Sequence, residues 1–181
     1  MTGDTGFKGS WLCLWLESLG ADVAGFALPP PADRPSNFVV SRVGERIRHV
    51  DGDVRDFDAL RALFAQHRPE VVFHLAAQPL VPVSYERPLE TFSTNVVGSV
   101  HVLEAVRVMG RPAAVVMVTS DKCYRNKEWV WGYRETDELG GDDPYSASKA
   151  AAELAITAYR HGFENVWQSA AVASPQPGAP P

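Results

Sequence analysis

Hydrophobic residues along the chain fall into two patterns, short continuous runs and longer stretches with helical spacing. The continuous runs predict buried strands at residues 22–28, 47–53, 70–77 and 113–120. The helical spacing predicts helices over residues 8–19, 88–109 and 144–159, and a further helix that begins after Asp56. Trp11 and Trp15 repeat at helical spacing within the first helix, and we interpret them as core residues.

An alternation of strands and helices is typical of a parallel sheet that is covered by helices on both faces. We therefore predict an α/β fold, a Rossmann-like doubly wound parallel sheet, over residues 1–163. Ligands of such sheets bind at the carboxyl ends of the strands. A glycine loop, Asp53, Ala76, Ala77 and Ser120 all fall at those predicted ends, so a binding site is expected there.

Both ends of the chain depart from the usual form of this fold. A glycine loop of this kind normally follows a central strand, whereas only Met1 precedes Thr2, so we expect the first strand to be missing. At the other end, residues 164–181 are rich in alanine and proline. This composition predicts an irregular tail.

The glycine loop carries Gly3, Gly6 and Gly9 at a spacing of three residues. Glycines let a backbone approach a pyrophosphate, and the N-terminus of the following helix adds partial positive charge. The loop therefore favours a dinucleotide, although a flexible turn before a helix remains an alternative. The acidic residue that usually holds the adenosine ribose is absent from residues 27–29, while Asp53 and Val54 could face the adenine.

Tyr145 and Lys149 are four residues apart on a predicted helix, so they share one face. A nearby ammonium favours the phenolate of a tyrosine and lowers its pKa, which would let Tyr145 take a proton from an alcohol. Ser120, at a strand end, could hydrogen-bond the same oxygen. A Tyr and Lys on the surface of an ordinary helix are the alternative, which the glycine loop and Ser120 make less attractive.

Two polar residues, Asp121 and Lys122, follow Ser120 and suggest acid and base chemistry beyond oxidation. The alternative is a solvated loop after a strand. Three aromatic residues in the next loop, Trp129, Trp131 and Tyr133, could form a hydrophobic plug, a dimer contact or a lid.

The bulk composition narrows the class of protein. The net charge of −5 without a sustained basic patch argues against nucleic acid as a partner, and no apolar run reaches the ~20 residues that span a bilayer. Two cysteines form no disulfide framework, which indicates reduced thiols and a cytoplasmic location.

The five histidines are scattered without zinc-site spacing, and we interpret His74 as a satisfied core histidine, so no metal is expected.

Several longer motifs resemble the extended short-chain dehydrogenase/reductases, the NAD-dependent epimerase/dehydratase family, and within it the CDP-glucose 4,6-dehydratase subgroup. The glycine loop and the Tyr-x-x-x-Lys pair mark only the superfamily. Within the matching segments 119–124 and 128–135, residues 120–124 and 128–133 are much more specific to the subgroup. The other matching segments are residues 74–81, 95–98 and 140–149. The likeness covers roughly residues 2–163, and it implies that the C-terminal substrate-binding lobe of the family is absent.

The resemblance implies a bound NAD and a nucleotide-sugar substrate, CDP-glucose. Tyr145, assisted by Ser120 and Lys149, would remove the proton of the sugar 4-hydroxyl, Lys122 would take the C5 proton, and Asp121 would protonate the departing 6-hydroxyl. Substrate contacts would come from Gln78 and Ser84. Cofactor contacts would come from Gly3, Thr5, Gly6, Phe7, Gly9, Asp53, Val54, Leu75, Ala76, Ala77, Asn95, Thr119, Tyr145 and Lys149.

The product would be CDP-4-keto-6-deoxyglucose, a precursor in deoxysugar and O-antigen synthesis. The resemblance also implies a homodimer through the two long helices, residues 88–109 and 145–159. Two alternatives stay open. One is another nucleotide-sugar epimerase or dehydratase, against which the pair Asp121 and Lys122 argues in the case of an epimerase. The other is a non-catalytic NAD-binding fragment.

Overall fold

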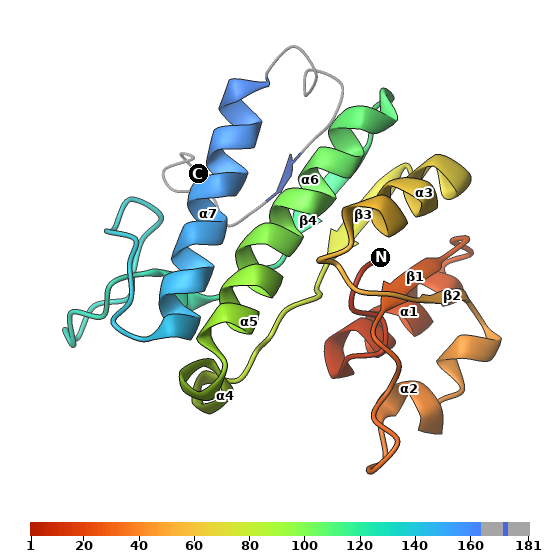
Figure 1. Cartoon of the computed structure of the whole chain (residues 1–181), viewed down its shortest axis with the longest axis horizontal. Helices are drawn as coiled ribbons and strands as arrows, with labels where there is room; N and C mark the ends of the chain where they lie inside the picture. Colours follow the sequence, from red (N-terminus) through yellow and green to blue (C-terminus); the bar gives the residue numbers. More distant parts are fainter. Residues whose placement is uncertain (164–171, 174–181) are drawn as a thin grey trace.

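The computed structural model describes residues 1–163 and 172–173, and its strands all pair in parallel (Figure 1). Strand β1 (Ala24–Ala27) pairs with β2 (Arg48–Asp51). Strand β3 (Val71–His74) pairs with β4 (Ala114–Met117). The remaining strand, β5 (Val172–Ala173), pairs with β4. The rest of the tail predicted at residues 164–181 lies outside the described residues.

The first residues of the chain lie between the two groups of strands. Thr2 forms parallel bridges to both Phe26 of β1 and His74 of β3. The amide of Thr2 donates to the Phe73 carbonyl at 2.9 Å, and the amide of Gly3 donates to the Phe26 carbonyl at 2.9 Å. Residues 1–3 therefore lie between β1 and β3, where the end of a central strand is expected before a glycine loop.

Helices follow the strands in the order that the hydrophobic pattern predicts. Asp56 caps one helix by accepting from the amide of Ala59 at 3.0 Å, and Asp143 caps another by accepting from the amide of Ser146 at 2.9 Å. The helical segments are α1 (Phe7–Ser18), α2 (Asn37–Val40), η1 (Val43–Glu45), α3 (Phe57–His67), α4 (Val81–Glu86), α5 (Pro88–Phe92), the π-helical η2 (Ser93–Val97), α6 (Gly98–Met109), η3 (Asp121–Cys123) and α7 (Pro144–Gly162).

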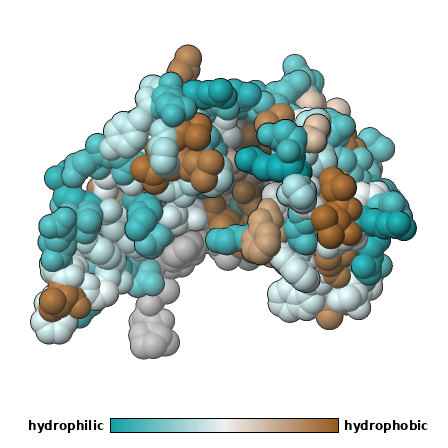
Figure 2. Space-filling model, turned by 90° about the horizontal axis from the view of Figure 1, so that it is seen from below, coloured by the Kyte–Doolittle hydropathy of each residue, from teal (hydrophilic) through white to brown (hydrophobic). Residues whose placement is uncertain are grey.

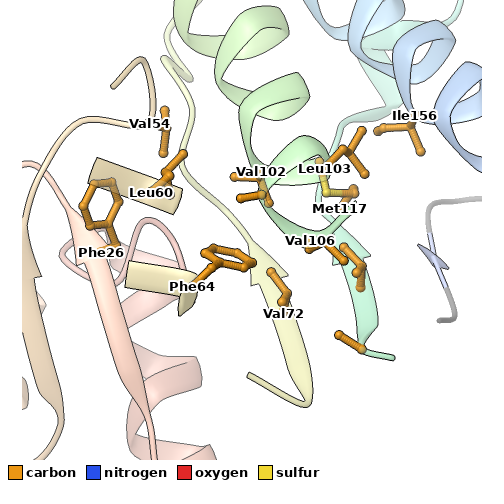
Figure 3. Packing of buried hydrophobic residues seen from close by; sticks show 13 residues of the cluster. Phe26, Val54, Leu60, Phe64, Val72, Val102, Leu103, Val106, Met117 and Ile156 are labelled. Carbon is orange, nitrogen blue, oxygen red and sulfur yellow. The ribbon is translucent and has the colours of Figure 1, made fainter. Parts of the chain in front are cut away.

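Two hydrophobic clusters hold the helices on the sheet. The larger cluster joins α3, α6 and α7 to the strands, and side chains such as Phe64, Val72 and Val102 point toward one another between these layers (Figure 3). A smaller cluster contains Cys13 of α1 and Phe38 of α2. The sheet is therefore covered by two separate sets of helices, as the doubly wound α/β prediction requires.

The long helix predicted at residues 88–109 is continuous in direction but contains a π-helical turn, η2. Its inward face is polar at the start: Thr91, Asn95 and Ser99 are buried, whereas Leu89 is 83% exposed. The buried polar groups all have hydrogen-bond partners on neighbouring elements. The apolar side chains before Gly98 therefore lie largely outside the core.

The interpretation of Trp11 and Trp15 as core residues is wrong. Trp11 is 56% exposed and Trp15 is 63% exposed, and Leu19 continues their row at 68%. The inward face of α1 instead carries the small residues Gly9, Ser10 and Cys13. Small residues let α1 approach the sheet closely, which leaves the bulky side chains on the outside.

Candidate active site

Most of the predicted site residues gather around one cavity of about 570 Å³ at the carboxyl ends of the strands. Its floor is the glycine loop, and its walls come from the ends of β1, β2, β3 and β4 and from the start of α7. The predicted site residues that line it are Gly3, Thr5, Gly6, Phe7, Gly9, Asp53, Val54, Leu75, Ala76, Ala77, Gln78, Thr119, Tyr145 and Lys149.

The glycine loop is packed too closely for side chains at two of its positions. Gly3 has a φ of +80°, and a Cβ there would lie 2.7 Å from the amide nitrogen of Ala76. A Cβ on Gly9 would lie 2.0 Å from the Gly3 carbonyl oxygen. This close approach brings the N-terminus of α1, with its first amides and positive dipole end, to the cavity.

A buried acid lies within the glycine loop. The Asp4 carboxylate accepts a hydrogen bond from Nδ1 of His49 at 2.6 Å, and the other ring nitrogen of His49 lies 3.0 Å from the Asp51 carboxylate. Burial raises the pKa of Asp4, although His49 opposes this shift. Burial lowers the pKa of His49, but Asp51 and Asp4 outweigh it and raise the pKa above the ordinary value.

The Asp4–His49–Asp51 array was not predicted, although an acidic residue among loop glycines is a visible signal. The array connects the glycine loop to β2. Because the Asp4 side chain is fully buried, we infer that Asp4 fixes the position of the loop and does not contact a ligand directly.

Tyr145 and Lys149 both lie on the first turns of α7 and are 8% and 6% exposed. Their position follows from the helix cap at Asp143 and from Pro144 in the first turn. Burial lowers the pKa of Lys149 to about 8, against the opposing charge of Glu153. The amide of Tyr145 donates to the hydroxyl of Ser84 at 3.2 Å, so Ser84 fixes the start of the helix.

The predicted acid and base, Asp121 and Lys122, lie on η3 beside a second cavity of about 300 Å³. Their side chains are 79% and 60% exposed and form an ion pair at 3.5 Å. Ser120 donates to the Asp121 carboxylate at 3.1 Å and accepts from the amide of Lys122 at 3.2 Å. Of the predicted catalytic residues, Tyr145 and Lys149 thus line the first cavity and Asp121 and Lys122 the second, while Ser120 lines neither.

Three predicted contact residues are held mainly by the protein itself. Asn95 is 1% exposed, and its side chain binds the backbone of Gln78 and the hydroxyl of Ser148. The Gln78 side chain donates to Thr91 at 2.9 Å. Ser84 is fully buried and donates to the Val81 carbonyl at 2.7 Å. Their contacts to a cofactor or substrate stay predictions.

Asp53 lines the cavity, but its carboxylate already binds a neighbour, and its contact to a cofactor stays a prediction. Arg55 donates to both carboxylate oxygens of Asp53 through its Nε, at 3.0 and 2.9 Å. This pairing lowers the pKa of Asp53. The charge of Arg55 at this end of the cavity is therefore neutralised within the protein.

One buried acid beside the cavity was not predicted. Glu153 is 4% exposed on α7, one turn after Lys149, and accepts a hydrogen bond from the hydroxyl of Thr119. The signal in the sequence is a single acid within the run Ala150 to Ala155, on the face that carries Lys149. Small apolar neighbours around one charged residue are compatible with burial of that charge.

Metal ligation and membrane insertion find no support in the part of the chain that the structure describes. Among these residues no group of three or more His, Cys, Asp or Glu side chains could hold a metal ion. The helices of the described part are also too short or too polar to cross a membrane.

Comparison with known proteins decides the family. A sequence profile of the family described as GDP-mannose 4,6 dehydratase matches residues 1–174. The chain belongs to this dehydratase family. Among curated relatives of the family, the CDP-glucose 4,6-dehydratase of Salmonella typhimurium is 56% identical over 165 residues, which are 91% of this chain and 46% of that protein. A UDP-glucose 4-epimerase of Mycolicibacterium smegmatis is 32% identical over 91% of this chain and 51% of its own length.

Solved structures agree with the family assignment. The UDP-glucose 4-epimerase of Thermus thermophilus, in complex with NAD, is 28% identical with a TM-score of 0.74 over 90% of this chain and 50% of that chain. The dTDP-glucose 4,6-dehydratase DesIV of Streptomyces venezuelae, with NAD and DAU bound, is 25% identical with a TM-score of 0.76 over 90% of this chain and 51% of that chain. The chain spans about half the length of the relatives it matches.

Proposed function

We propose that this chain carries the NAD site and the catalytic residues of a nucleotide-sugar 4,6-dehydratase that acts on CDP-glucose. The observation that carries the proposal is that Tyr145 and Lys149 line the same cavity as the glycine loop. The 56% identity to a CDP-glucose 4,6-dehydratase supports the choice of nucleotide. The cytoplasm, where nucleotide sugars are made, is the expected location.

The cavity fits a dinucleotide. Gly3 and Gly9 leave room where a Cβ would collide with the backbone, and the N-terminus of α1 supplies donors for a pyrophosphate. Val54, Leu75 and Ala76 supply apolar walls for the adenine and nicotinamide rings. When bound, NAD would accept a hydride from C4 of the sugar and return it to C6.

The residues divide the proton transfers among them. Tyr145, with the Lys149 ammonium nearby and Ser120 as hydrogen-bond partner, would remove the proton of the 4-hydroxyl. Lys122 would then take the C5 proton, which the 4-ketone makes acidic. Asp121 would protonate the 6-hydroxyl as it departs. Lys122 and Asp121 pair at 3.5 Å on an exposed turn, so we expect the substrate to separate them.

The test is to incubate the chain with NAD and CDP-glucose in deuterated water and to follow the sugar by NMR. The proposal predicts CDP-4-keto-6-deoxyglucose with deuterium at C5, and its loss in Tyr145→Phe. In Lys122→Ala, oxidation at C4 should proceed without elimination. Normal product formation by Lys122→Ala would contradict the role of that residue.

Two other results would point to the alternative functions. Inversion at C4 without loss of water would indicate an epimerase, which the identity to UDP-glucose 4-epimerases makes a reasonable second candidate. Binding of NAD measured by calorimetry, without turnover of any nucleotide sugar, would indicate a binding module.

We also propose a homodimer through α5 and α6, which follow one another along one direction in Figure 1, and α7, which lies beside them. Leu89 of α5 and Leu154 of α7 are 83% and 60% exposed. The small residues Ala147 and Ala151 on α7 would permit close approach of a second copy. Apolar side chains on neighbouring helices are typical of an interface when they form one surface.

A further inference from the structure

The buried residue Glu153 lies one helical turn after Lys149, whose ammonium the proposed chemistry uses. Lys149 and Glu153 are four residues apart on α7, so their side chains share a face. Both residues are buried, at 6% and 4% exposure. An ammonium removed from water is unstable unless a compensating charge is near, and the structure must therefore supply one.

The other titratable groups that act on Lys149 supply no negative charge at neutral pH. Cys123 of η3 is buried, which raises the pKa of its thiol to about 11 and keeps it neutral. Lys8 of α1 adds a positive charge and disfavours the ammonium. His74 of β3 is neutral, because burial lowers its pKa to about 3. Glu153 is thus the compensating group among those that the structure describes around Lys149.

Glu153 is itself fixed by a residue at the end of β4. The hydroxyl of Thr119 donates to a carboxylate oxygen of Glu153, and Thr119 lines the cavity that also contains Lys149. This bond joins the carboxyl end of β4 to α7 and holds the carboxylate on the cavity side of the helix.

We propose that Glu153 is a positioning residue whose buried charge keeps Lys149 as an ammonium and whose bond to Thr119 fixes β4 against α7. Glu153 thus acts on the proposed chemistry through Lys149 and not by touching the substrate. Replacement by glutamine keeps an acceptor for Thr119 but removes the charge, whereas Thr119→Val keeps the charge and removes the bond. The role of Lys149 in this inference rests on the proposed function.

The test is a titration of the Lys149 amine in the full chain by competitive labelling with acetic anhydride, read by mass spectrometry of the peptide that carries Lys149. The wild-type midpoint should lie at about pH 8. In Glu153→Gln it should fall by about one pH unit or more, since an opposite charge at close range shifts a pKa by that amount. Thr119→Val should leave the midpoint near the wild-type value, as should Glu86→Gln, a matched change of an exposed acid on α4.

An unchanged midpoint in Glu153→Gln would overturn the inference, as would an equal fall in Thr119→Val. If circular dichroism shows that Glu153→Gln is unfolded, Glu153→Asp is the second variant. Its side chain is shorter by one methylene, which moves the carboxylate away from Lys149, so the Lys149 midpoint should fall by less than the amount expected for Glu153→Gln. A wild-type midpoint in that variant would also overturn it. The labelling needs no turnover, so a chain that shows the shift but dehydrates no sugar retains this inference and loses the proposed function.

Discussion

At the scale of single residues, the closest packing in the site is at the glycine loop. We expect Gly9→Ala to lose dinucleotide binding, because its Cβ would lie 2.0 Å from the Gly3 carbonyl oxygen and would force the loop away from α1. Gly162→Ala is the control, since nothing lies within 4 Å of a Cβ at that helical position. Calorimetric titration with NAD measures both variants. Equal affinities would mean that the loop adapts to the extra carbon.

His74 makes the stability of the chain sensitive to acid. It is 3% exposed between Thr2 and Ser99, and burial lowers its pKa from 6.5 to about 3. The unfolded chain therefore binds a proton between these values that the folded chain does not bind. The contribution of neutral His74 to the free energy of unfolding is therefore fully present above pH 6.5 and is lost as the pH falls toward 3. By pH 5 the loss should be about 2 kcal/mol.

Urea unfolding at pH 7.5 and pH 5 measures this loss. In His74→Asn the difference in the free energy of unfolding between the two pH values should shrink by about the same amount. An unchanged difference would assign the acid sensitivity to other groups whose pKa is lowered on folding, such as the amine of Met1.

At the scale of elements, the sequence predicts those features that depend only on residues close together in the chain. The positions of the strands and the caps at Asp56 and Asp143 follow from apolar runs and side-chain acceptors, and the structure confirms them. The inward face of residues 88–109 does not follow from periodicity. Its buried Asn95 and Ser99 are satisfied by residues distant in sequence, such as Gln78 and His74, and no local pattern contains those partners.

The same limit applies to the site. The residues that share the cavity come from several separate segments, and the pattern of strand ends predicts most of them. The separation of Asp121 and Lys122 into a second cavity depends on how η3 turns after β4. The burial of Glu153 depends on how α7 packs. Both are properties of tertiary packing.

The burial of individual leucines predicts how much each contributes to the free energy of unfolding. Leu103 is fully buried between the sheet and the helices, so Leu103→Ala should reduce the free energy of unfolding by about 2–5 kcal/mol. Leu19→Ala, at the exposed end of α1 and outside the proposed dimer surface, should change it by less than about 0.5 kcal/mol. Chemical denaturation compares the two variants. A loss in Leu19→Ala as large as that in Leu103→Ala would contradict the prediction.

At the scale of the whole molecule, the exposed apolar side chains allow the proposed dimer to be tested. Leu89 and Leu154 lie on the helices α5 and α7 of the proposed dimer surface, and Figure 2 shows hydrophobic side chains gathered in several groups on another view of the surface. A charge at the centre of a dimer interface is costly to bury. We therefore expect Leu154→Glu to be monomeric at concentrations at which the wild type is dimeric. Sedimentation velocity measures this, with Leu80→Glu, outside the three helices, as control.

The outward row of Trp11 and Trp15 has a spectroscopic consequence. The tryptophans of the described part of the chain, which also include Trp129 and Trp131, are between 40% and 73% exposed. The indole rings of these four residues are already in contact with water in the folded chain, so unfolding should shift their emission little, and iodide should quench it. Binding of a partner over α1 would reverse both properties, which makes the intrinsic fluorescence a reporter of surface coverage rather than of folding.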